Sequence, residues 1–98
     1  MVHHIVMFRL DGEAAAVADA AKRFKAAIEA LPSKIAELSS VEVEINDGPA
    51  AGNWTLVLHG VCGSYADLDA YSAHPEHLAC VAIIKPLVAG RACVDYVK

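Results

Sequence analysis

Basic side chains are scarce in this sequence, and none of them are clustered. The chain carries 8 Lys and Arg residues against 12 Asp and Glu residues, which gives a formal net charge of −4. Proteins that bind nucleic acid gather positive charge on one face to meet the phosphates. The composition therefore argues against nucleic acid as a partner.

Long hydrophobic runs are also missing. The longest, from Leu78 to Ile84, is stopped by Lys85 and Pro86, far short of the roughly 20 residues that span a bilayer. The first ten residues lack a basic n-region, and Arg9 interrupts them before a signal-peptide core could form. We therefore expect no membrane partner and a cytoplasmic location.

Cysteine is present only as three separate residues, Cys62, Cys80 and Cys93. An odd number without C-x-x-C spacing suggests neither a disulfide framework nor a thiolate zinc site. Each lies among small apolar residues, so we expect buried free thiols of the kind found in a reducing compartment.

Cofactor and metal motifs are absent as well. The chain has no Gly-rich phosphate loop, no nucleophile elbow and no usefully spaced pair of acids. His74 and His77 have an H-x-x-H spacing, but a third and fourth ligand are not evident, and the following proline holds His74 in an extended conformation. The sequence predicts no cofactor and no metal site.

Hydrophobic residues make up 56% of the 98 residues, above the roughly 45–50% of ordinary soluble domains. A chain of this length forms one domain, 1–98, because two cores would each be too small to fold alone. Such a small interior cannot hide the apolar excess, and a second copy of the chain is the common way to cover it. The composition thus predicts a homodimer.

The pattern of apolar residues predicts the order βαββαβ, with the second helical segment split in two. Alternation favours strands over 2–10, 41–45, 53–62 and 91–97, and helical spacing favours helices over 13–31, 64–71 and 76–85, leaving 33–40 unassigned. This order is typical of an α+β, ferredoxin-like fold with a four-stranded antiparallel sheet. The first strand is apolar on both faces, so the face away from the helices is expected to pack on a second subunit.

Chemistry is indicated in one stretch, Tyr71 to Leu87. Pro75 suits the first turn of a helix, and the helix after it carries a stripe of four residues at helical spacing, namely His77, Val81, Ile84 and Val88. A titratable ring therefore faces inward, and the Tyr71 hydroxyl could reach the same space from the preceding helix.

Three blocks of the sequence, HHIVMFRL, HPEHL and IKPLVAGRACVDY, resemble the stress-responsive A/B barrel (Dabb) domains. The resemblance covers nearly the whole chain and implies a dimeric α+β barrel. The family includes stress-associated proteins, bacterial proteins of unknown role and a plant polyketide cyclase. In that cyclase a Tyr and a His carry an aldol-type ring closure, and they match Tyr71 and His77.

A pocket histidine in the cyclase's first strand matches His4. A further histidine of its third strand is replaced here by Leu56, and His59 lies on the opposite face of that strand. We expect the pocket to be lined by residues of the first and third strands and of the last helix, namely His4, Phe8, Trp54, Leu56, Val81 and Ile84.

Two functions stay open at this point. The first is a dimeric stress-type domain without catalysis, whose pocket binds a small apolar molecule or is filled by its own side chains. In that case His77 donates a hydrogen bond to a backbone carbonyl, and His4 is a core histidine with its hydrogen bonds satisfied. The second is a cofactor-free enzyme acting on a carbonyl or polyketide-like compound, a cyclase or isomerase, with His77 taking a proton and Tyr71 orienting the substrate. A cofactor-free monooxygenase is a third option, resting on fold analogy alone.

Overall fold

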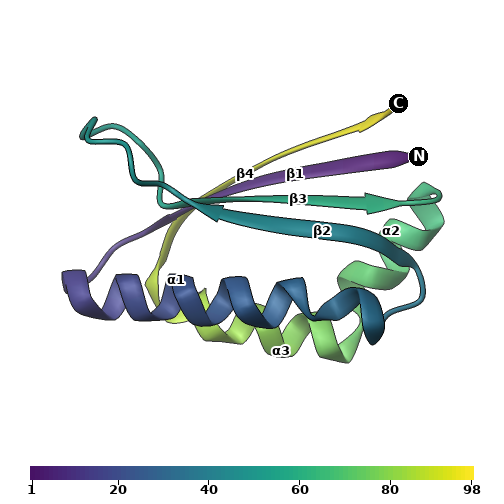
Figure 1. Ribbon diagram of the computed structural model, residues 1–98, viewed down its shortest axis with the longest axis horizontal. Coiled ribbons are helices and arrows are strands. Elements are labelled where there is room, and N and C mark those ends of the chain that lie inside the picture. The colour runs from purple at the N-terminus through teal and green to yellow at the C-terminus, as the bar shows by residue number, and fades with distance from the viewer.

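Four strands and three α-helices make up the computed structural model, which describes residues 1–98 (Figure 1). In chain order they are β1 (Val2–Leu10), α1 (Ala14–Glu29), β2 (Leu38–Ile45), β3 (Leu56–Cys62), α2 (Tyr65–Ala73), α3 (Pro75–Ile84) and β4 (Val88–Val97). Short 3-10 turns occupy Leu31–Ser33 and Lys85–Leu87. None of the helices is both long and apolar enough to cross a membrane.

The sheet has the order β2-β3-β1-β4, and every neighbouring pair of strands is antiparallel. All helices lie on one side of it, with α1 and α3 running beneath the strands and α2 closing one end (Figure 1). The βαββαβ order and the ferredoxin-like sheet predicted from the sequence are confirmed.

The hydrophobic core lies between the sheet and the helices. Alternate residues of β1 point into it because successive side chains of a strand face opposite sides. Phe24 and Ile28 of α1 are completely buried against this face, and the Phe24 ring meets Phe8 edge to face at 5.8 Å between centroids. This packing fixes the positions of β1 and α1, between which the candidate site lies.

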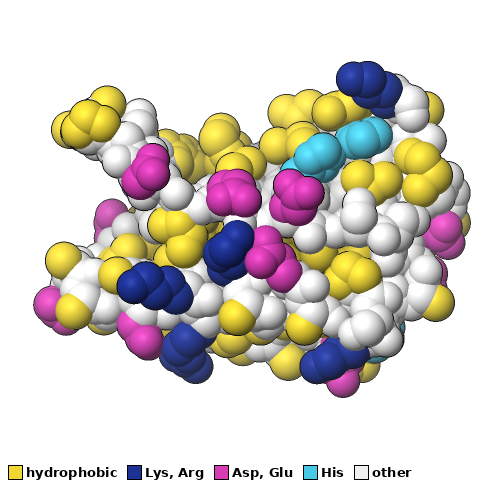
Figure 2. All heavy atoms as spheres, viewed as in Figure 1, with side chains coloured by type: hydrophobic (Ala, Val, Ile, Leu, Met, Phe, Trp, Pro, Cys, Tyr) yellow, Lys and Arg dark blue, Asp and Glu magenta, His cyan; other side chains and the backbone are white.

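The opposite face of the sheet has no cover within the chain. Met7 on β1 and Val94 and Tyr96 on β4 are 44%, 63% and 39% exposed. Figure 2 shows hydrophobic side chains gathered along this side of the molecule, away from the helices, with histidines among them. Contiguous exposed apolar surface of this kind marks an interaction surface.

Several element boundaries differ from the prediction. The unassigned segment 33–40 contains the start of β2 at Leu38, whose side chain is buried. Strand β4 begins at Val88, which was assigned to the helical stripe, because a 3-10 turn that contains Pro86 follows the end of α3 at Ile84. The predicted third strand was too long at its start, since β3 begins at Leu56.

Alternation along the strand predicted over 53–62 would place Trp54 on one face with Leu56 and Leu58, and that prediction was wrong. The Trp54 ring lies against Gly90, where an added Cβ would come within 3.1 Å of the indole. The Arg9 guanidinium stands 5.9 Å from the ring centroid. Because β3 starts only after Trp54, strand alternation does not govern this side chain.

Candidate functional site

A cavity of about 240 Å³ opens between the helix-facing side of the sheet and the helices. Its walls come from all three helices and from β1, β3 and β4, through His4, Val6, Phe8, Phe24, Leu58, Tyr71, Ser72, His77, Leu78, Val81 and Arg91. The volume lies just below the roughly 300–1,000 Å³ of drug-sized sites, so the cavity suits a small ligand.

Tyr71 lines this cavity from α2 and carries a buried hydroxyl. The residue is 1% exposed, and its hydroxyl has no hydrogen-bond partner. Burial raises the pKa of the phenol well above its usual value, with smaller contributions from Cys62 and Cys80, so the oxygen keeps its proton at neutral pH. An unpaired buried polar group of this kind costs about 1–3 kcal/mol. Tyr71 thus has a buried donor that lacks an acceptor within the chain.

His77 stands beside Tyr71 in the first turn of α3, with the two ring centroids 4.5 Å apart. Its Nδ1 lies 2.9 Å from the Ser72 carbonyl oxygen. A carbonyl only accepts, so Nδ1 carries the proton and Nε2 is left with the free electron pair. Burial lowers the pKa of His77, against a smaller opposing effect of the Ser72 carbonyl. The ring is therefore held neutral in one tautomer, which is the form that can accept a proton.

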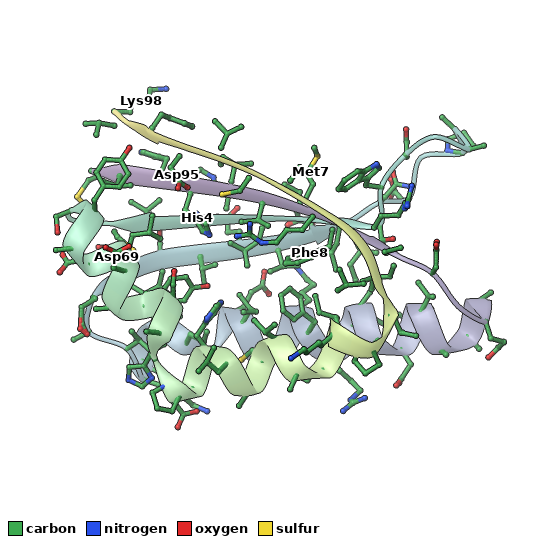
Figure 3. All side chains as sticks on the ribbon, turned by 180° about the vertical axis from the view of Figure 1, so that it is seen from behind. His4, Met7, Phe8, Asp69, Asp95 and Lys98 are labelled. Atoms are coloured by element: carbon green, nitrogen blue, oxygen red, sulfur yellow. The ribbon has the colours of Figure 1, made fainter.

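His4 enters the cavity from β1, where it is 8% exposed. Its Nδ1 donates to Oδ1 of Asp95 on the neighbouring strand at 2.5 Å, and the His4 and Tyr71 rings meet edge to face at 6.5 Å. The strand register explains the contact, because His4 lies directly opposite Asp95 in the β1–β4 pair. Figure 3 shows His4 and Phe8 on the helix side of the sheet and Met7 on the other side.

The structure brings together five of the eight residues named from the sequence, which are His4, Phe8, Tyr71, His77 and Val81. The other three lie elsewhere: Ile84 is completely buried in the core, and Trp54 and Leu56 line a separate hollow of about 310 Å³.

Leu58 lines the cavity where Leu56 was expected. Leu58 pairs with Val6, next to His4, whereas Leu56 pairs with Phe8 farther along β1. Sequence reasoning also missed Asp95 and Arg91. Alternation along the last strand places Arg91 and Asp95 on one face of it. Only the register of the β1–β4 pair shows that this is the same face of the sheet as that of His4.

The expectation of three buried thiols was correct for two of them. Cys62 and Cys80 are buried, whereas Cys93 is exposed. The reason is topological, because β4 is an edge strand and no helix covers it.

The comparisons with known proteins identify the family. The model of the stress responsive A/B barrel domain matches residues 2–98. The chain belongs to the Dabb family. No curated protein sequence matches this Dabb domain.

Solved structures agree with this assignment. A dimeric ferredoxin-like protein of unknown function from Bacteroides fragilis is 38% identical, with a TM-score of 0.92 over 97% of this chain and 93% of that one. A second such protein, from Thermobifida fusca, is 29% identical with a TM-score of 0.79 over 99% and 90% of the two chains. A hydroxynitrile lyase from Passiflora edulis shares the fold of this Dabb domain at 18% identity, with a TM-score of 0.75 over 99% and 93%.

Proposed function

We propose that this Dabb domain binds a small, mainly apolar molecule that carries a carbonyl or similar acceptor, which accepts a hydrogen bond from Tyr71. The observation that supports the proposal is the buried, unpartnered hydroxyl of Tyr71, a residue that lines a largely apolar cavity. Apolar walls with a few placed polar groups are what small-molecule sites share. A bound acceptor would remove the cost of the unpaired donor.

The test compares two ligands of nearly equal shape, acetophenone and ethylbenzene, of which only the first has an acceptor. Titration followed by protein NMR should give tighter binding of acetophenone to the wild type. In Tyr71→Phe this preference should disappear, while ethylbenzene binds as before. Equal affinity of both compounds for the wild type, or no shift of cavity resonances by either, would refute the proposal.

Catalysis at this site is a second candidate function, favoured by the state of His77. A neutral imidazole with its free nitrogen fixed by the Ser72 carbonyl can take a proton α to a carbonyl, the first step of an aldol-type closure or an isomerisation. The hydroxynitrile lyase neighbour is an enzyme with the same fold, although at 18% identity the argument rests on the residues of this chain.

Exchange of the α-methyl protons of acetophenone in D₂O measures this step without knowledge of the natural substrate. We expect wild-type protein to accelerate exchange and His77→Gln to lose the acceleration while still binding acetophenone. Binding without any acceleration would leave the binding function intact and eliminate the catalytic one.

We further propose that the chain forms a homodimer through the uncovered face of its sheet. Its Bacteroides and Thermobifida relatives are described as dimeric, and the exposed Met7, Val94 and Tyr96 lie on this face. An obligate interface would bury roughly 2,000 Å² or more. Sedimentation analysis at micromolar concentration should show a dimer, and a monomer would contradict this proposal.

A cytoplasmic location is proposed from the free cysteines. All three thiols are unpaired, which suits a reducing compartment. Fractionation of cells that express the native protein tests it, and recovery in an extracellular or membrane fraction would contradict it.

A further inference from the structure

Three side chains with metal-binding donors converge at the edge of the cavity, where β1 meets β4. They are His4, Cys93 and Asp95, whose donor atoms all lie within 4.8 Å of one another. His4 Nδ1 is 2.5 Å from Asp95 Oδ1 and 3.5 Å from Cys93 Sγ, and the sulfur is 3.4 Å from the carboxylate oxygen.

The strand register creates this cluster. His4 faces Asp95 across the β1–β4 pair, and Val6, two residues on, faces Cys93. Cys93 and Asp95 are two apart in an extended strand, so their side chains point to the same side. In the chain, His4 is 89 residues from Cys93 and 91 residues from Asp95. For that reason the sequence shows no metal-binding spacing.

The distances fit a tetrahedral zinc ion. With zinc–nitrogen and zinc–oxygen bonds of about 2.0 Å and a zinc–sulfur bond of about 2.3 Å, donors in a tetrahedral site lie about 3.3–3.5 Å apart. The two distances that involve sulfur already have these values. Only the histidine–carboxylate separation must widen, by about 0.8 Å, as the hydrogen bond gives way to metal bonds.

The donor types also favour zinc. A thiolate, an imidazole and a carboxylate form the mixed set that this borderline ion accepts, whereas Mg²⁺ and Ca²⁺ prefer oxygen alone. Thiolate and carboxylate together carry two negative charges, which balance the dication. The neighbouring Arg91 guanidinium opposes the ion only weakly, because its side chain is exposed to solvent.

We infer that His4, Cys93 and Asp95 form a zinc-binding site with three protein ligands and a fourth position open to water or to a ligand of the cavity. On binding, the Cys93 thiol gives its proton to solvent, and the His4 proton moves from Nδ1 to Nε2. Three protein ligands with one open position are the arrangement of catalytic rather than structural zinc sites. The inference stands apart from the proposed function, since it needs no organic ligand.

Cobalt(II) replaces zinc as a spectroscopic probe, because a cobalt–thiolate bond gives a charge-transfer absorption in the near ultraviolet. Titration of reduced wild-type protein with Co²⁺ should produce this absorption, saturate at one ion per chain, and be reversed by Zn²⁺. Cys93→Ser should abolish the absorption. It should also weaken Zn²⁺ binding by more than the roughly 10–100-fold that is typical when a metal ligand loses its hydrogen-bond partner. Asp95→Asn should weaken binding and keep the absorption.

Matched controls separate this site from the other thiols and histidines. Cys62→Ala and Cys80→Ala remove buried thiols that lie outside the cluster and should leave the absorption unchanged. His59→Ala removes one ring of a second histidine pair, in which His3 Nδ1 lies 2.8 Å from His59 Nε2, and should also leave it unchanged. No absorption in the wild type, or an absorption that persists in Cys93→Ser, would overturn the inference.

Discussion

Replacing Tyr71 with phenylalanine should stabilise the ligand-free protein. The change removes only the hydroxyl, which is buried and unpaired, and keeps the ring that packs beside His77 at 4.5 Å between centroids. The unpaired group costs about 1–3 kcal/mol, so its removal should raise the free energy of unfolding by up to that amount. For a domain of this size each kcal/mol shifts Tm by about 4–8 °C.

The same variant should bind an acceptor ligand less well. A hydrogen bond contributes about 0.5–1.5 kcal/mol net, which corresponds to about 2- to 12-fold in Kd for acetophenone. Stability and affinity therefore move in opposite directions, a combination that a residue used only for packing would not produce.

Thermal unfolding by circular dichroism, at one fixed protein concentration, and NMR titration measure the two effects. Tyr65→Phe is the matched control, because it removes the hydroxyl of a tyrosine that is 48% exposed and should change neither quantity. A Tm of Tyr71→Phe that falls by several degrees would show that the hydroxyl is already satisfied in the folded protein, and the reasoning behind the binding site would be refuted.

Three other predictions follow from the same contacts. Val57→Asp, on the uncovered face, should give monomers or insoluble protein by sedimentation, whereas Ala26→Asp on the exposed side of α1 should remain dimeric. His77 has a lowered pKa, so the unfolded chain, with a pKa of about 6.5 at this residue, binds more protons than the folded one, and the free energy of unfolding decreases as the pH is lowered through 6.5. Urea titrations at pH 7 and 5.5 should show a smaller decrease in the free energy of unfolding for His77→Gln than for the wild type, and an equal decrease would contradict the assigned burial. Glu29 accepts hydrogen bonds from the Val43 amide at 3.0 Å and from Lys25, and both lower the pKa of its carboxyl. The stabilising effect of the carboxylate is present above the unfolded-state pKa and is lost as the pH falls through the folded-state pKa. Glu29→Gln should therefore be less stable than the wild type at pH 7, with a difference that shrinks in acid, and a difference that does not change with pH would contradict this prediction.

The sequence by itself determined the fold class and the directions in which the site residues of β1 and α3 point. Alternation in β1 placed His4 and Phe8 on one face, because the two-residue period of a strand is a local property. Pro75 and the helical spacing after it put His77 and Val81 on the cavity side of α3. These inferences needed no information about which elements are neighbours.

The tertiary structure decided the contacts between strands. Asp95 meets His4, and Leu58 rather than Leu56 reaches the cavity, because the register of antiparallel pairs is fixed by turns and by the packed core rather than by either strand alone. The position of β4 at the sheet edge exposed Cys93 beside that pair. A local pattern reports which way a side chain points, and only the assembled sheet determines what it meets there.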